Sequence, residues 1–331
     1  MTRKLIALVL AAACLVVFTT GTASAKTTLK LATMAPKQSP WGKVFTKWTD
    51  IVSSKTDGEV VMEWSWNGVG GDEKNVVEKI ASGQYHGSAL TAVGLSSIDK
   101  SVLALQVPGT FSSWGELDAG RAKIAKSFKK KVKKEGFYLL GWGDVGKARV
   151  MSVGFAVKSP EDLKGKNPAM IRDDVIAPAL YATIGGVSPV FGSITEFLPM
   201  LQSKKVNVMN TPALAAEQLQ WASRLTHMNT GDVAFAIGAL VLSNKALQAM
   251  PKDQAKIVKR YGKKAAKRLT KNIRAADDAA FARLKKKMTT HDPTAAEKAE
   301  WKALFKTACK KLGNENSIDK DTLKKIGACT F

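Results

Sequence analysis

The 331-residue sequence has only three cysteines and three histidines. These few side chains lie in unrelated contexts, which argues against a metal site built from several sulfur or imidazole ligands. The sequence also lacks a Gly-x-Ser-x-Gly elbow, a His-Glu-x-x-His pair and a phosphate loop ending in Gly-Lys-Ser or Gly-Lys-Thr. We therefore expect no catalysis and no cofactor. An enzyme would need an acid, a base or a nucleophile in a catalytic arrangement, and the sequence shows no such arrangement.

Acidic residues are scarce, because 28 Asp and Glu stand against 51 Lys and Arg and leave a net charge of +23. Much of the excess lies in residues 126–134 and 251–288, both with helical apolar spacing. Such charge can indicate nucleic-acid binding, but no aromatic residues are interleaved with these lysines. We interpret both segments as solvated helix faces and expect no nucleic-acid partner.

Long apolar runs are absent except at the N-terminus. Arg3 and Lys4 precede an apolar stretch at residues 5–18, and Ala-Ser-Ala at residues 23–25 is a typical cleavage signal. This pattern predicts a signal peptide over residues 1–25, a mature chain that begins at Lys26, and a periplasmic location.

The cysteines fit export to an oxidising compartment. Cys309 and Cys329 are 20 positions apart near the C-terminus, and we predict that they form a disulfide. A redox or metal pair would need closer spacing and a neighbouring histidine. Cys14 leaves a lipoprotein signal as an alternative, although Ala11 stands where a large aliphatic residue is expected.

Strand and helix patterns alternate along the mature chain, which predicts an α/β fold with largely parallel strands. Ser39 and Pro40 are a cap and first residue for a helix with apolar Trp41, Val44 and Phe45. Residues 251–288 predict one long helix, or two end to end. Further strands are predicted at residues 28–34, 59–66, 88–91, 137–141, 150–157, 169–172 and 206–209, further helices at 73–81, 177–184 and 194–202, and loops at 67–72 and 92–95.

An ordered series of segments resembles a known family. These segments are residues 38–48, 70–73, 89–95, 140–146, 158–166, 184–189, 201–207, 218–221 and 238–243. Together they are similar to the solute-binding proteins of tripartite ATP-independent periplasmic (TRAP) transporters, over roughly residues 28–290. The resemblance is strongest to the branch whose operons encode a tetratricopeptide-repeat partner protein.

The resemblance implies a two-lobed periplasmic binding protein, each lobe a sheet flanked by helices, braced by a long helix. Residues 26–149 would form the first part of lobe 1, 150–235 lobe 2, 236–290 the return to lobe 1 and the long helix, and 291–331 a helical C-terminal extension. The lobes would close on a small ligand and deliver it to a sodium- or proton-driven permease. A tetratricopeptide-repeat protein would be a further partner.

The resemblance also indicates a ligand site, with one departure. Acid-binding members place an arginine where this sequence has Met170, and Arg172 follows two residues later on the same strand face. Arg172 could hold a substrate carboxylate from a shifted position, or it could pair with Asp173 or Asp174 at the rim. The predicted ligand-binding residues are Met34, Trp41, Thr91, Val93, Trp142, Met170, Arg172, Asn210, Thr211 and Phe235.

This predicted lining favours an apolar or amphipathic ligand over a small dicarboxylate, and an organic acid remains the alternative. Met34, Trp41 and Met170 could equally be core residues. A second functional class also stays open, namely an envelope scaffold or sensor with a degenerate cleft.

Overall fold

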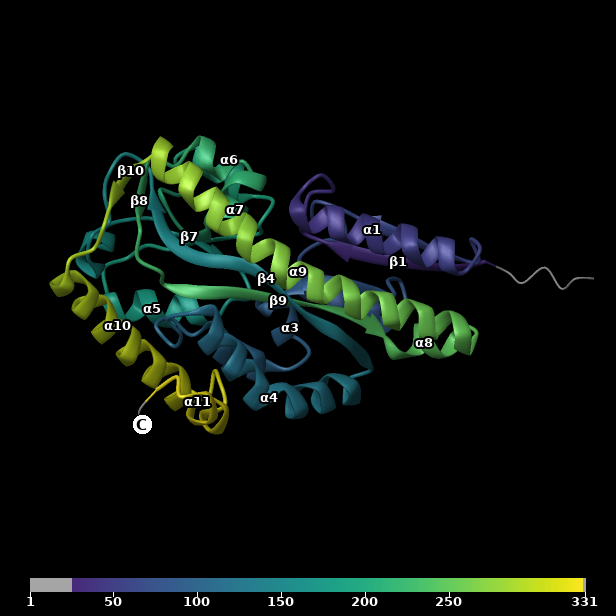
Figure 1. The fold of residues 1–331 in the computed structure, drawn as a ribbon. Coiled ribbons are helices and arrows are strands. Elements are labelled where there is room, and N and C mark those ends of the chain that lie inside the picture. The colour runs from purple at the N-terminus through teal and green to yellow at the C-terminus, as the bar shows by residue number, and fades with distance from the viewer. Residues whose placement is uncertain (1–25, 330–331) are drawn as a thin grey trace, which may run out of the picture.

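A computed structural model describes residues 26–329, so the predicted signal peptide and Cys14 lie outside the described residues. The main element is an eight-stranded sheet that runs through the middle of the molecule (Figure 1). Its order is β10 (Thr289–His291), β8 (His227–Asn229), β4 (Phe137–Ser152), β9 (Ala234–Ser243), β3 (Gly87–Thr91), β1 (Thr27–Thr33) and β2 (Val60–Ser65), with β7 (Val208–Pro212) also beside β4. A second, two-stranded sheet pairs β5 (Ala169–Ile171) with β6 (Val190–Gly192).

The main sheet is mixed, and the prediction of largely parallel strands is wrong for it. β1 is parallel to β2 and β3, but β9 is antiparallel to β3 and β4, and β4 is antiparallel to β7 and β8. Apolar runs arise in either kind of sheet when helices cover both faces, so the sequence pattern does not encode strand direction.

Strand β4 is one element of 16 residues where two separate strands, at residues 137–141 and 150–157, were predicted. Two glycines within β4 make room for a helix. A Cβ at Gly141 would lie 2.8 Å from the Ala266 side chain, and one at Gly143 would lie 3.3 Å from the Leu269 side chain. Glycine in a strand interior often marks such close approach.

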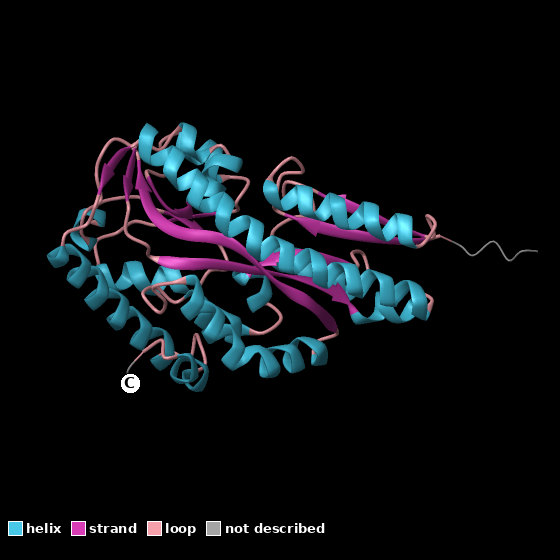
Figure 2. Cartoon of the chain, viewed as in Figure 1, coloured by secondary structure: helices cyan, strands magenta, loops and turns pink. Residues whose placement is uncertain are grey.

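Helices cover both faces of the sheet (Figure 2). α9 (Lys252–Lys287) is a single 36-residue helix on one face, as its apolar spacing predicts, and α1 (Pro40–Lys55) packs beside it. α4 (Trp114–Lys134) packs on the opposite face of β4. The Ser39 cap of α1 is confirmed, since its Oγ accepts a hydrogen bond from the Gly42 amide at 3.2 Å.

Shorter helices connect these elements. They are α2 (Glu73–Ser82), α3 (Ala92–Ser96), η1 (Lys100–Gln106), η2 (Pro160–Leu163), α5 (Ile176–Ile184), α6 (Phe197–Gln202), α7 (Ala213–Gln218), η3 (Trp221–Ser223) and α8 (Asn244–Ala249). α3 occupies the segment predicted as a loop at residues 92–95, because a helix of five residues is too short to show a periodic pattern.

The C-terminal extension contains α10 (Ala295–Asn314) and α11 (Lys320–Ile326), which pack against α5 and α4 respectively. The predicted disulfide between Cys309 and Cys329 is present, with the two Cα atoms 6.0 Å apart. It ties the end of the described chain to α10.

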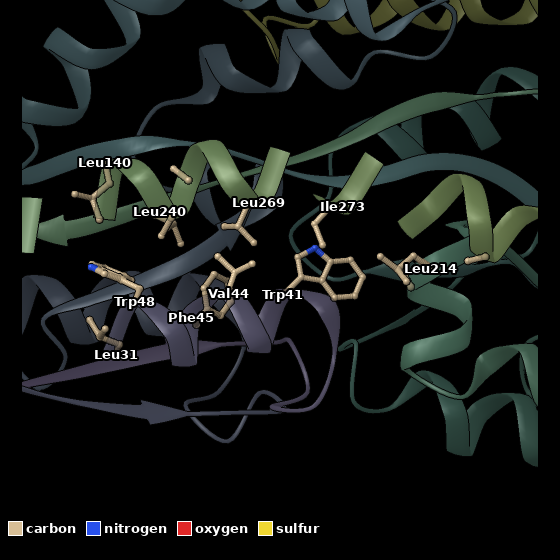
Figure 3. Packing of buried hydrophobic residues seen from close by; sticks show 14 of the residues in the cluster. Leu31, Trp41, Val44, Phe45, Trp48, Leu140, Leu214, Leu240, Leu269 and Ile273 are labelled. Carbon is tan, nitrogen blue, oxygen red and sulfur yellow. The ribbon is translucent and has the colours of Figure 1, made fainter. Parts of the chain in front are cut away.

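The largest core cluster fills the space between α1, α9 and the sheet (Figure 3). Val44, Phe45 and Trp48 of α1 face Leu269 and Ile273 of α9 across this space. Among residues 26–329, no helix combines the length and the apolar character needed to cross a membrane.

Candidate ligand-binding site

A cavity of about 260 Å³ lies where several strands end. Its wall includes the residues that follow β1 and β3, the last residues of β5 and β7, and the middle of β4 and β9. α5, α6 and α7 contribute apolar side chains. Ligands in α/β folds bind beyond the carboxyl ends of strands, so this cavity is the candidate site.

Eight of the ten predicted site residues line this cavity. These are Met34, Trp41, Thr91, Val93, Met170, Asn210, Thr211 and Phe235. Trp41 is also fixed by a hydrogen bond from its Nε1 to the carbonyl oxygen of Asp144 at 3.1 Å. Their role in ligand binding stays a prediction, but the structure brings them together around one space.

Trp142 lies away from the cavity lining, on the α4 side of β4. Its ring stacks on Phe128 with centroids 5.1 Å apart, and the Arg121 guanidinium lies 5.4 Å from its ring centroid. The alternation of side chains along β4 places Trp142 in this core.

Arg172 also lies outside the lining, at the edge of the site. Its Nη1 is 3.3 Å from Asp72 Oδ2 and its Nη2 is 2.5 Å from Glu196 Oε2. These partners differ from the alternative pairing with Asp173 or Asp174. Asp173 instead lies 3.8 Å from Lys74 Nζ.

The charged residues in the lining are all acidic, namely Glu73, Asp144 and Asp174. Within the described chain, no Lys, Arg or His side chain lines the cavity. Met170, which is 2 % exposed, lies in the wall.

Glu73 is a buried carboxylate held by backbone and side-chain donors. It accepts hydrogen bonds from the amides of Thr91 and Gly94 at 2.7 and 3.0 Å and from the Thr91 hydroxyl at 2.5 Å. Burial raises the pKa of Glu73 although these three bonds oppose the shift. The sequence places Glu73 in the Gly-Gly-Asp-Glu segment, but only the fold shows that its carboxylate reaches Thr91.

Asp144 belongs to a buried ion-pair network. It contacts Arg121 of α4 and lies 2.6 Å from Nε of Arg274 on α9, and Arg274 also pairs with Asp118 at 2.6 Å. This network joins the helices on the two faces of the sheet. Asp144 is therefore neutralised by its own neighbours and offers little free charge to a ligand.

The sequence matches a known protein family. A model of "bacterial extracellular solute-binding protein, family 7" (DctP) matches residues 31–316. The chain belongs to this family. No curated protein sequence matches it.

Solved structures of TRAP periplasmic solute-binding proteins share the fold of this family 7 protein. One from Sulfurospirillum deleyianum with bound succinate is 19 % identical, with a TM-score of 0.84 over 91 % of this chain and 98 % of that one. One from Haemophilus influenzae with bound L-gulonate is 17 % identical, with a TM-score of 0.82 over 91 % and 99 %. The galactonate-bound protein of Advenella mimigardefordensis is 15 % identical, with a TM-score of 0.84 over 92 % and 97 %.

The family 7 protein is thus a solute-binding protein and not an enzyme, and it shares the two-lobed fold of the TRAP periplasmic binding proteins. Within residues 26–329, no group of three or more His, Cys, Asp or Glu is arranged to hold a metal ion.

Several lining residues were missed by the sequence reasoning. Asp174 accepts a hydrogen bond from the Ile176 amide at 2.8 Å, and burial raises its pKa. Burial and the nearby Asp174 carboxylate also raise the pKa of Tyr181. Phe197 and Trp221 pack edge to face with ring centroids 5.8 Å apart. The sequence shows Tyr181, Phe197 and Trp221 only as apolar positions in short helical segments, a pattern that any core helix shares. Asp174 was considered as a partner of Arg172 and not as a lining residue.

Proposed function

We propose that this family 7 protein captures a small apolar or amphipathic organic molecule in its cavity by lobe closure. The observation that carries this proposal is the lining, which combines aromatic and aliphatic side chains with three acidic residues and, in the described chain, no basic residue. The ligand would then pass to an ion-driven TRAP permease in the membrane.

A ligand that carries a carboxylate would be costly to bury in this cavity. Transfer of an unpaired carboxylate from water into an apolar cavity costs several kcal/mol, and a fixed cation normally offsets that cost. Here the charged or acidic side chains in the described lining include no Lys, Arg or His, so the lining offers no fixed cation to offset that cost. An apolar ligand has no such penalty and gains from burial.

An organic acid is the second candidate, and two observations favour it. The structurally similar TRAP proteins bind succinate, L-gulonate and galactonate. In addition, Arg172 directly follows Ile171, which lines the cavity. Arg172 would have to leave Asp72 and Glu196 to form a bidentate pair with a ligand carboxylate.

Calorimetry with the Arg172→Ala variant separates the two candidates. Apolar or amphipathic molecules and short dicarboxylates would be titrated side by side. We expect apolar binding to change by less than about tenfold, or 1.4 kcal/mol, and dicarboxylates not to bind tightly to either protein. Tight dicarboxylate binding that is lost in the variant would overturn the apolar assignment.

Arg224→Ala is the matched control, because Arg224 is also an exposed arginine and has no ion pair among the described residues. Native mass spectrometry of gently purified protein would test the remaining alternative. A co-purifying small molecule supports transport, whereas an empty cleft under all conditions supports a scaffold or sensor.

The proposed cellular setting follows from the family and the sequence. We propose cleavage after residue 25, lobes divided at residues 149/150 and 235/236, and an extension from residue 291. The permease subunits and a tetratricopeptide-repeat protein are the proposed partners. N-terminal sequencing of the secreted protein that finds a residue other than Lys26 would contradict the cleavage site.

A further inference from the structure

The first part of α9 carries a dense row of basic side chains. Between residues 252 and 271 there are nine basic residues and a single acidic one, Asp253. We call these nine the α9 basic ridge: Lys252, Lys256, Lys259, Arg260, Lys263, Lys264, Lys267, Arg268 and Lys271. Eight of them are exposed and Lys259 is half-buried.

No residue of the α9 basic ridge forms an ion pair with any part of the chain from residue 26 to residue 329. The second half of the same helix behaves differently. Arg274 pairs with Asp118, Arg283 with Glu217, and Lys285 with Asp292. In the described chain, the fold thus pairs three basic residues of the second half of α9 with carboxylates and pairs none of the ridge with a carboxylate. The ridge residues Lys259 and Lys263 lie over the Tyr138 ring, and Arg260 and Lys264 lie over the Tyr261 ring, contacts that leave their charge uncompensated.

The ridge covers the exposed side of the first part of α9. Val258, Gly262, Ala265 and Leu269 form the buried stripe of α9, and the basic side chains lie on the opposite side of the helix. At 1.5 Å per residue the ridge is about 28 Å long. Figure 1 shows this part of α9 in front of the sheet, between α1 and α8, with no other element across it.

We propose that the α9 basic ridge docks the mature protein on an anionic phospholipid surface. Unpaired like charges along one helix repel each other, and a negatively charged bilayer would relieve that repulsion. A protein partner is favoured less, because protein interfaces have an apolar or aromatic centre. The large hydrophobic residues exposed in the described chain are Val69 and Phe191, and neither lies on α9.

Docking through this ridge leaves the cavity free. The single lining residue that α9 contributes is Leu269, which lies on its buried side. A membrane-bound protein could therefore still take up its ligand, and it would be concentrated where membrane components of the transporter lie. The inference does not depend on which ligand the cavity holds.

Vesicle sedimentation of the mature chain tests the proposal. Vesicles of phosphatidylcholine with about one third phosphatidylglycerol would be compared with pure phosphatidylcholine vesicles at low and high salt. We expect binding to the anionic vesicles alone, and its loss at high salt, because screening shortens the range of charge–charge attraction.

The ridge variant carries Lys256→Gln, Arg260→Gln, Lys263→Gln and Lys267→Gln. We expect it to partition to the anionic vesicles about tenfold more weakly or worse. The matched control carries Lys298→Gln, Lys302→Gln, Lys306→Gln and Lys310→Gln on α10. These four are also exposed lysines without ion pairs in the described chain, and the net charge changes equally. The control should retain wild-type binding.

An equal loss in both variants would show a general charge effect and overturn the assignment to α9. Wild-type protein that stays in the supernatant with anionic vesicles would overturn membrane docking and leave an acidic protein as the partner. A labelling measurement on the wild type avoids any folding defect of the variants. Anionic vesicles should protect Lys256, Lys263 and Lys267 from acetylation but leave Lys302 and Lys306 reactive, and the reverse pattern would contradict the proposal.

Discussion

At the scale of single residues, the acidic side chains in the cavity wall are stabilised by different kinds of partner. Glu73 has no basic partner among residues 26–329 and is held by three hydrogen bonds from Thr91 and Gly94. Asp144 has two arginine partners. The two residues should therefore respond differently to substitution and to pH.

The stability contributed by Glu73 should fall as pH rises. Burial raises the pKa of Glu73 from 4.5 in the folded state. At low pH the group is protonated in both the folded and unfolded states, so the fold is not destabilised by a buried charge. As pH rises through the folded-state pKa, the buried carboxylate ionises and destabilises the fold. The melting temperature of the wild type minus that of Glu73→Gln should therefore decrease from acid to neutral pH. Glu78→Gln, an exposed position on the same helix, is the control, and a pH-independent difference for Glu73 would contradict the prediction.

Asp144→Asn should strongly destabilise the protein. The substitution leaves Arg121, whose side chain is 5 % exposed, as a buried charge without its full partner. Removal of one member of a buried ion pair costs about 3–5 kcal/mol, which denaturant unfolding would measure. Asp118→Asn is the control. Because the Asp118 side chain is 50 % exposed, this substitution should lower the free energy of unfolding by less than about 1 kcal/mol. Equal effects at both positions would contradict the importance of burial.

At the scale of elements, close contact between α9 and its neighbours explains the glycine within α9. A Cβ at Gly262 would lie 2.7 Å from Leu140 and 2.9 Å from the Trp48 ring. Glycine is otherwise unfavourable in a helix interior, so this contact is the physical reason for its presence. α9, β4 and α1 thus fit together only if this position has no side chain.

Gly262→Ala should therefore destabilise the protein by about 1–3 kcal/mol through overpacking, despite the better helix propensity of alanine. Gly115→Ala provides the matched comparison on α4. The nearest atom to a Cβ at Gly115 is Ser113 Oγ at 3.8 Å, so this change should stabilise slightly, by up to about 1 kcal/mol. Thermal unfolding of both variants measures the contrast, and stabilisation in both would show that the contact at Gly262 relaxes freely.

The sequence predicted those elements well whose apolar periodicity continues without interruption over many residues. α9 was expected over residues 251–288 and spans Lys252–Lys287, because its apolar spacing persists over many turns. β4 was predicted only as two separate strands, at residues 137–141 and 150–157, whereas it continues through glycines that serve helix packing. The family resemblance led us to predict the strand-end residues Thr91 and Thr211 as site residues, and both line the cavity. Glu73 and Phe197 also line the cavity but were not predicted, since their position depends on contacts with residues far away in the sequence.

At the scale of the whole molecule, ion pairs cross between the predicted lobes at the edge of the cavity. Arg172 pairs with Asp72, and Lys74 pairs with Asp173. Asp72 and Lys74 lie at the start of α2, whereas Arg172 and Asp173 follow β5. Exposed pairs of this kind contribute little to folding, but they can bias a balance between open and closed forms.

The double variant Asp72→Asn/Lys74→Gln should shift ligand-free protein toward the open form. It removes both crossing pairs and leaves the net charge unchanged. Small-angle scattering should give a larger radius of gyration than for the wild type, and a saturating ligand should reduce the difference. Glu161→Gln/Lys164→Gln removes a 2.6 Å pair within one predicted lobe and should leave the radius unchanged. Equal radii for all three proteins would show that these pairs do not control closure.

Strands β4 and β9 pair almost from end to end, from Phe137 opposite Ser243 to Ala148 opposite Ala234. The proposed lobe boundaries at residues 149/150 and 235/236 fall within these strands, so the chain passes from one lobe to the other without a linker. Both predicted lobes therefore share β4 and β9 as continuous strands. The protein should therefore melt as one cooperative unit, with a calorimetric enthalpy equal to the van't Hoff enthalpy.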